Sequence, residues 1–90
     1  MNEELICSNR IQDNKYNYYL VESTCNIEYV GEVLRYGIKI NKYNLNNKIV
    51  DTKCIFDIFD SKSKMIKAIR ILSKLEVTPI TLEDIVVDNI

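Results

Sequence analysis

The residue types that most often carry chemistry in small proteins are histidine, cysteine and the carboxylates. Histidine is absent from this 90-residue sequence, which removes the commonest general base, the Ser–His and Cys–His nucleophile pairs and most mixed zinc sites. The three cysteines, Cys7, Cys25 and Cys54, are widely spaced and form no CxxC pair. We therefore predict structural cysteines and no metal site.

The carboxylates and glycines give no stronger signal. Asp57 with Asp60, and Asp84 with Asp88, are the pairs that could do general acid–base work, but such pairs on small domains are mostly solvated faces or helix-capping charges. Both glycines stand outside any GxGxxG or GxxxxGK[ST] pattern. The sequence predicts no enzyme and no cofactor, and a small acid-dependent hydrolase is only a third hypothesis.

Two clusters of like charge remain as candidate interaction sites. The candidate interaction residues are acidic: Glu83, Asp84 and Asp88. The alternative is a basic patch: Lys62, Lys64, Lys67, Arg70 and Lys74. Cations on one helix face can neutralise phosphates, but the segment has no Asn or Gln to read bases and no helix-turn-helix partner. We therefore favour a protein partner over nucleic acid.

Composition limits the class of protein. With 47% hydrophobic and 28% charged residues, the chain is expected to fold as a single domain over residues 1–90. A net charge of −1 gives no global attraction to nucleic acid or an anionic membrane. Apolar runs fall well short of the ~18 to 20 residues that a membrane span needs, and the cysteine usage fits a reducing compartment. We expect a cytoplasmic protein without membrane contact.

The elements that position these residues begin with strands. Residues 34–40 alternate, with Leu34, Tyr36, Ile38 and Ile40 on one face. Residues 50–58 alternate in the same way, which predicts Val50, Thr52, Cys54, Phe56 and Ile58 facing inward. Residues 44–47 supply a turn between these two strands.

Upstream, tyrosine-rich residues 16–22 favour a further strand, and residues 23–26 favour a turn. We place strands near residues 4–8, 15–23, 27–40 and 48–58, within a span of roughly 4–58. Core and cross-strand packing explains the tyrosines better than a base-stacking platform. A platform would require Tyr16, Tyr18 and Tyr19 to face solvent.

A helix is predicted over roughly 61–76, starting at Asp60 or Ser61. Its apolar arc covers roughly 220°, more than one sheet face can cover, so either the C-terminal segment or another chain must cover the rest, and self-association stays open. Pro79 ends this helix, and Thr81 caps a short second helix over roughly 82–88. Its acids suggest that it docks beside the basic helix.

These elements predict an α+β fold, an antiparallel β-meander of three to four strands packed against one C-terminal helix and followed by a short second helix. The expected core lies between the sheet and the first helix. It comprises Leu34, Tyr36, Ile38, Ile40, Cys54, Phe56, Ile58, Ile69 and Leu72.

Four blocks of the sequence together resemble an uncharacterised small-protein family of clostridia and related Firmicutes. They are residues 16–22 (YNYYLVE), 36–40 (YGIKI), 57–58 (DI) and 76–88 (EVTPITLEDIVVD). The resemblance spans most of the chain and implies a common fold. The family is a domain of unknown function, so the resemblance implies no catalytic residue.

The leading hypothesis is a non-enzymatic protein-interaction domain, a regulator or an inhibitor of another protein, acting through its helical C-terminal region or an exposed sheet edge. The alternative is a nucleic-acid-binding module that uses the basic face of helix 61–76. The identity of the protein partner cannot be read from the residues.

Overall fold

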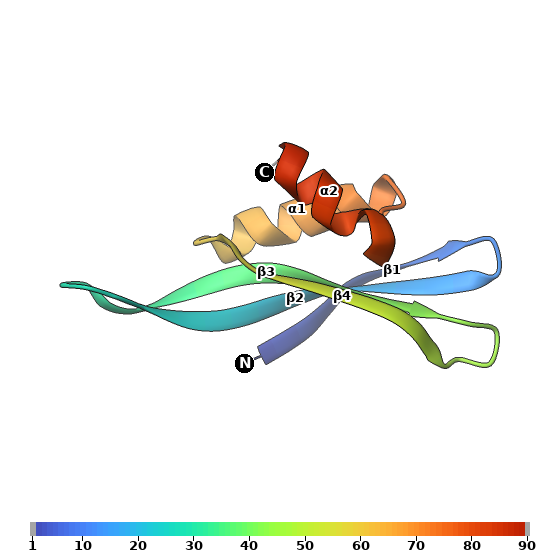
Figure 1. Cartoon of the computed structure of the whole chain (residues 1–90), viewed down its shortest axis with the longest axis horizontal. Helices are drawn as coiled ribbons and strands as arrows, with labels where there is room; N and C mark the ends of the chain where they lie inside the picture. Colours follow the sequence, from blue (N-terminus) through green and yellow to red (C-terminus); the bar gives the residue numbers. More distant parts are fainter. Residues whose placement is uncertain (1, 90) are drawn as a thin grey trace.

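The computed structural model describes residues 2–89; Met1 and Ile90, which the predicted domain included, lie outside the described residues. Four strands form one antiparallel sheet in the order β1-β2-β3-β4, and two helices follow (Figure 1). The elements are β1 (Asn2–Ile11), β2 (Asn14–Ile27), β3 (Gly31–Tyr43), β4 (Ile49–Phe59), α1 (Lys62–Lys74) and α2 (Pro79–Asn89). The predicted α+β class is confirmed.

Two of the predicted local signals form as expected. Ser61 is the N-cap of α1, and its Oγ accepts a hydrogen bond of 3.3 Å from the backbone N–H of Lys64. In the β3–β4 turn, Asn44 Oδ1 accepts hydrogen bonds from the backbone N–H groups of Asn46 and Lys48, at 2.9 and 3.1 Å. Short polar side chains therefore fix both boundaries.

The start of the second helix was predicted three residues too late. α2 begins at Pro79, where a proline fits the first helical turn because its missing N–H needs no partner there. The carbonyl of Thr78 accepts from the backbone N–H of Leu82, and the Thr81 hydroxyl accepts from the Thr78 N–H at 3.1 Å. Thr81 therefore lies inside the helix and supports its first turn.

The predicted turn at residues 23–26 is wrong. β2 continues through Ile27, and the chain turns at residues 28–30, where the Val30 N–H donates to the Ile27 carbonyl at 3.1 Å. Cross-strand pairing overrides the local turn preference, since Cys25 pairs with Val33 across the hairpin. The usable sequence signal is Gly31, whose φ of 96° suits glycine.

The β2–β3 hairpin extends beyond its neighbours. Pairing with β1 ends at Glu22, and pairing with β4 ends at Tyr36. Residues 23–35, which we call the arm, therefore form a two-stranded ribbon whose strands pair only with each other within the described chain. Figure 1 shows the arm reaching away from the helices at one end of the molecule, whose long axis measures 49 Å.

The rest of the sheet, which we call the body, is covered on one face by both helices (Figure 1). α1 contacts all four strands, and α2 contacts β3 and β4. The core confirms Tyr36, Ile38, Ile40, Ile69 and Leu72 from the predicted set. Its other buried members are Tyr16, Tyr18, Leu20, Met65, Val77 and Leu82.

The predicted inward face of β4 is wrong over most of the strand. Cys54 pairs with Lys39 and Ile55 pairs with Ile38, so Ile55 faces the helices and Cys54 faces the open side. A shift of one residue exchanges the two faces of a strand. Val50, Thr52 and Phe56 are exposed rather than core residues, and Leu34 lies on the arm, beyond the helices.

β4 also contains an irregularity that the alternating pattern does not reveal. Tyr36 pairs with Phe59 although Ile38 pairs with Ile55, so β4 contains two extra residues opposite this step. Asp57, within this stretch, has a φ of 60°. After it, Ile58 again packs against the core, as predicted.

Candidate interaction surfaces

The acidic candidates Glu83, Asp84 and Asp88 all lie exposed on α2. Glu83 Oε2 is 3.1 Å from Lys53 Nζ on β4. The acidic segment is therefore tied to the sheet, whereas we expected it to pair with the basic residues of α1. This exposed ion pair contributes less than ~1 kcal/mol to folding, and within residues 2–89 Asp84 and Asp88 form no ion pair.

The basic candidates Lys62, Lys64, Lys67, Arg70 and Lys74 are exposed along α1. Lys62 lies 3.8 Å from Glu4 of β1, and the other four form no ion pair within the described chain. Two apolar side chains lie among them, Ile71 at 51% exposure and Leu75 at 66%. Part of the wide apolar arc of α1 thus remains uncovered.

A polar row crosses the open face of the body, opposite the helices. Ser8, Asn17, Asn41 and Thr52 are directly paired from β1 to β4. The Ser8 hydroxyl donates to Asn17 Oδ1 at 2.7 Å, and the Thr52 hydroxyl donates to Asn41 Oδ1 at 2.6 Å. Both asparagines are buried, so these bonds satisfy groups that would otherwise be costly to bury.

Two tyrosine hydroxyls accept hydrogen bonds from the asparagines of this row. Asn17 Nδ2 donates to the Tyr19 hydroxyl at 3.2 Å, Asn41 Nδ2 donates to the Tyr43 hydroxyl at 3.3 Å, and the two hydroxyls lie 3.4 Å apart. Burial, with the hydrogen bond to Tyr43, raises the pKa of Tyr19, whereas the bonds from Tyr19 and Asn41 lower the pKa of Tyr43. Either hydroxyl of this pair could donate to the other.

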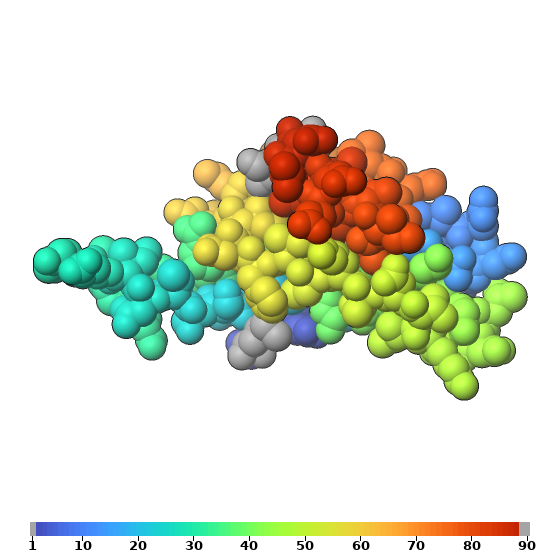
Figure 2. Space-filling model, viewed as in Figure 1, coloured from blue at the N-terminus to red at the C-terminus, as the bar shows by residue number. Residues whose placement is uncertain are grey.

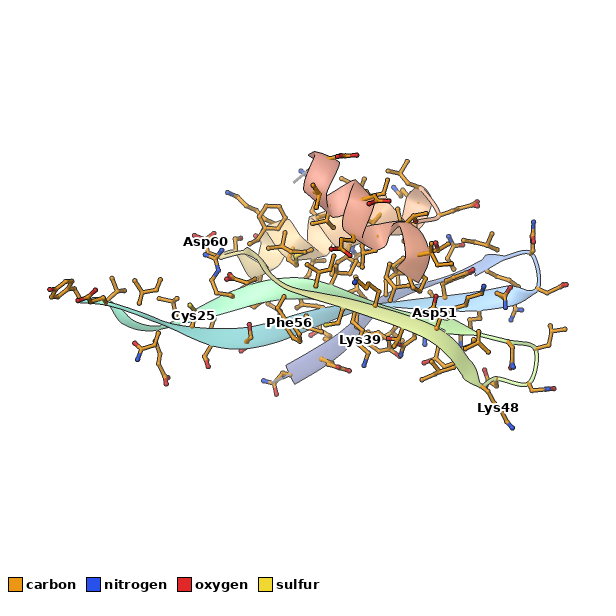
Figure 3. All side chains as sticks on the ribbon, viewed as in Figure 1. Cys25, Lys39, Lys48, Asp51, Phe56 and Asp60 are labelled. Carbon is orange, nitrogen blue, oxygen red and sulfur yellow. The ribbon has the colours of Figure 1, made fainter. Side chains whose placement is uncertain are left out.

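Lysines flank these tyrosines. Lys39 Nζ lies 5.7 Å from the centre of the Tyr19 ring and 3.0 Å from Glu3 Oε1, and Lys15 Nζ lies 5.9 Å from the Tyr43 ring centre. Figure 3 shows Lys39 on the side of the sheet away from the helices. The centre of the open face thus carries polar side chains that bind one another.

The arm has a different character. Ile27, Tyr29, Val30 and Leu34 are all exposed, Tyr29 at 99% and Val30 at 67%. The only ion pair of the arm among the described residues joins Arg35 to Asp57 at its base. Figure 2 shows the arm projecting from the rest of the surface, and Figure 3 places Cys25 on it. Four apolar side chains are therefore exposed on this part of the sheet, which the helices do not cover.

The backbone of the arm is also open. No described strand pairs with the outer edge of β2 beyond Glu22 or of β3 before Tyr36, so backbone N–H and C=O groups face outward along both edges. A shallow hollow lined by Asn2, Ser23 and Thr24 lies beside the first residue of β1.

Sequence reasoning found the two charged clusters and missed the polar row and the arm. Asn17 and Asn41 were the available signal for the row, because asparagine is disfavoured in strand interiors. Core packing was the right interpretation for Tyr16 and Tyr18. Of the three tyrosines that a stacking platform required, Tyr19 alone reaches the open face.

Among residues 2–89, no three His, Cys, Asp or Glu side chains gather as metal ligands would. Neither helix of the described chain has the length and apolar character needed to cross a membrane.

A family model described as "Family of unknown function (DUF6514)" matches residues 1–90, and the chain belongs to this family. The resemblance to a family of unknown function is therefore confirmed, while its bacterial clade stays a prediction. Comparison with curated proteins and with solved structures finds no match.

Proposed function

We propose that this member of a family of unknown function is a protein-interaction domain, and that the arm is its binding surface. One observation carries the proposal: a ribbon of two strands presents exposed apolar side chains where neither helix nor neighbouring strand supports it. An isolated two-stranded ribbon is only marginally stable in water, and exposed apolar patches of folded proteins commonly mark interaction sites.

The partner would contact the arm in two ways. An extended segment could pair with the open edge of β2 or β3 through main-chain hydrogen bonds, which supply affinity in strand addition. Ile27, Tyr29 and Val30 would supply apolar contact at the tip, where an exposed aromatic side chain is a typical anchor. A regulator or inhibitor of another protein could act by such docking without any catalytic group.

The test compares the arm with the opposite end of the sheet. Tyr29→Asn with Val30→Ser removes the apolar tip, and asparagine tolerates the φ of 68° at position 29. Leu45→Ser is the matched control, because Leu45 is 75% exposed in the β3–β4 turn. Affinity capture from a lysate of the source cells, followed by binding of the purified captured protein, should succeed with wild type and the control and fail with the arm variant. Equal binding by all three would contradict the proposal.

The alternative, nucleic-acid binding through α1, has one observation in its favour, the exposure of all five cations. It predicts that labelled single-stranded and duplex oligonucleotides bind the chain with an affinity that falls steeply with salt, and that Lys67→Ala with Arg70→Ala weakens this binding. The proposal predicts no such binding at physiological salt. Fluorescence anisotropy at two salt concentrations distinguishes the two functions.

A further inference from the structure

The outer part of the arm is acidic as well as apolar. Between Asn26 and Val33 the sequence contains Glu28 and Glu32 and no basic residue. Both carboxylates are exposed and form no ion pair within the described chain. The tip is therefore an apolar surface with two negative charges beside it, and it fits a partner whose apolar surface has positive charges beside it.

The chain itself presents such a surface on α1. Ile71 and Leu75 lie one turn apart and are half or more exposed. Lys67 and Lys74 lie one turn from Ile71 on the same helix, and Arg70 is adjacent. Residues 62–75 contain no acid. We call Lys67, Arg70, Ile71, Lys74 and Leu75 the outer face of α1.

These two surfaces do not meet within one chain. The arm continues β2 and β3 away from the helices, so its tip lies at an end of the molecule (Figure 1). A contact between two arms would bring carboxylates together, and a contact between two α1 faces would bring ammonium and guanidinium groups together. Each of these symmetric contacts is therefore repulsive. The favourable contact joins the arm of one chain to α1 of another.

We propose that the arm docks on the outer face of α1 of a second copy, an inference that rests on the arm being the binding surface. Such a contact uses two different patches, so each added copy leaves one arm and one α1 face free. Contacts of this type build a ring when the rotation closes and a filament when it does not. Wild-type chains should therefore form assemblies larger than dimers.

α2 is the other acidic and apolar surface of the chain, with Ile80 and Val87 exposed near Asp84 and Asp88. It is less suited to the outer face of α1 because it already packs on β3 and β4 and is tied to Lys53. The arm beyond Arg35, in contrast, pairs with no other strand among residues 2–89. Ile80→Ser with Val87→Ser is accordingly the control for this surface.

The experiment mixes two variants that each lack one half of the contact. The arm variant is Tyr29→Asn with Val30→Ser, and the α1 variant is Ile71→Ser with Leu75→Ser. Alone, each should associate at least about tenfold more weakly than wild type, as truncating contact side chains commonly does. When the two variants are mixed, the intact arm of the α1 variant can dock on the intact α1 face of the arm variant. The mixture should therefore form one-to-one dimers and nothing larger.

Sedimentation velocity at low and physiological salt gives the readout, with circular dichroism to show that each variant is folded. The α2 control should assemble like wild type, and assembly should weaken with salt. A wild type that stays monomeric at high concentration would overturn the self-docking. The arm would still be the proposed binding surface if the arm variant failed to bind the protein that wild type captures. A mixture that stays monomeric while wild type assembles, or a monomeric α2 control, would also overturn the self-docking.

Discussion

β2 and β3 each run through two environments, the body and the arm. In the body, neighbouring strands flank both edges and the helices cover one face, and Ile38 is fully buried. In the arm, the same ladder continues with no described strand beside it and no described helix over it, and Leu34 on β3 is 46% exposed. The hydrogen-bonded pairing is alike in both halves. The surrounding elements, rather than the strand itself, decide which apolar residues form a core and which remain available for contact.

The face of the sheet opposite the helices shows a second difference between the body and the arm. Over the body it carries the polar row of Ser8, Asn17, Asn41 and Thr52, whose members satisfy one another. No buried side-chain nitrogen or oxygen of the described residues lacks a hydrogen-bond partner. The buried polar groups of the body therefore need no partner to complete their hydrogen bonds, whereas the arm has open backbone edges along both of its strands.

The largest expected effect contrasts two residues of β3. Ile38→Ala should lower the free energy of unfolding by about 2 to 5 kcal/mol, because it leaves a cavity in the core. Leu34→Ala should lower it by less than about 0.5 kcal/mol, since an exposed side chain loses little on truncation. Urea denaturation of both variants measures the difference. Equal costs would show that the arm is part of the core.

The two glycines provide the next contrast. A Cβ at Gly37, in the body, would lie 2.1 Å from the carbonyl oxygen of Ile55, so Gly37→Ala should cost at least about 1 to 3 kcal/mol. At Gly31, in the arm, a Cβ would meet open space, and only its φ of 96° opposes alanine. Gly31→Ala should leave the melting temperature nearer that of wild type. The reverse order would contradict the close approach of β4 at Gly37.

Alkaline pH should affect the body through Tyr18. Its hydroxyl donates to the Val77 carbonyl at 2.7 Å, and burial raises its pKa from 10.0 to about 12. The folded state therefore holds this proton more tightly than the unfolded state, so the stabilisation is full below pH 10 and is lost as the pH rises toward about 12. Tyr18→Phe should cost about 1 kcal/mol at pH 7 and flatten this decline. The free energy of unfolding, measured in urea from pH 8 to 11, tests this prediction. If Tyr18→Phe lost stability with pH as steeply as wild type, Tyr18 would not be the residue responsible for the decline.

The smallest expected effect concerns α2. Asp84→Asn with Asp88→Asn removes exposed charges and should change the free energy of unfolding by less than about 1 kcal/mol. If the arm is the binding surface, the association rate with the captured protein should also stay close to that of wild type. A slower association rate with a flatter salt dependence would move the binding surface from the arm to α2.

The sequence predicts those parts of the fold that depend on residues close together in the chain. The alternation of residues 34–40 and the cap at Ser61 are local, and both predictions hold. The faces of β4 depend on its register with β3, in which Cys54 lies opposite Lys39, and alternation within β4 alone cannot reveal that register. The arm depends on where β1 and β4 stop pairing. The arm, our proposed binding surface, was missed for this reason: its exposure is set by neighbours distant in sequence.

Hydrogen–deuterium exchange of the chain, alone and with the purified captured protein, tests the central claim most directly. Binding at the arm predicts slower exchange of backbone amides in residues 23–35, while amides in the β3–β4 turn and in α2 exchange as before. Protection confined to α2 or to α1 of the bound chain, with the arm unchanged, would contradict the account.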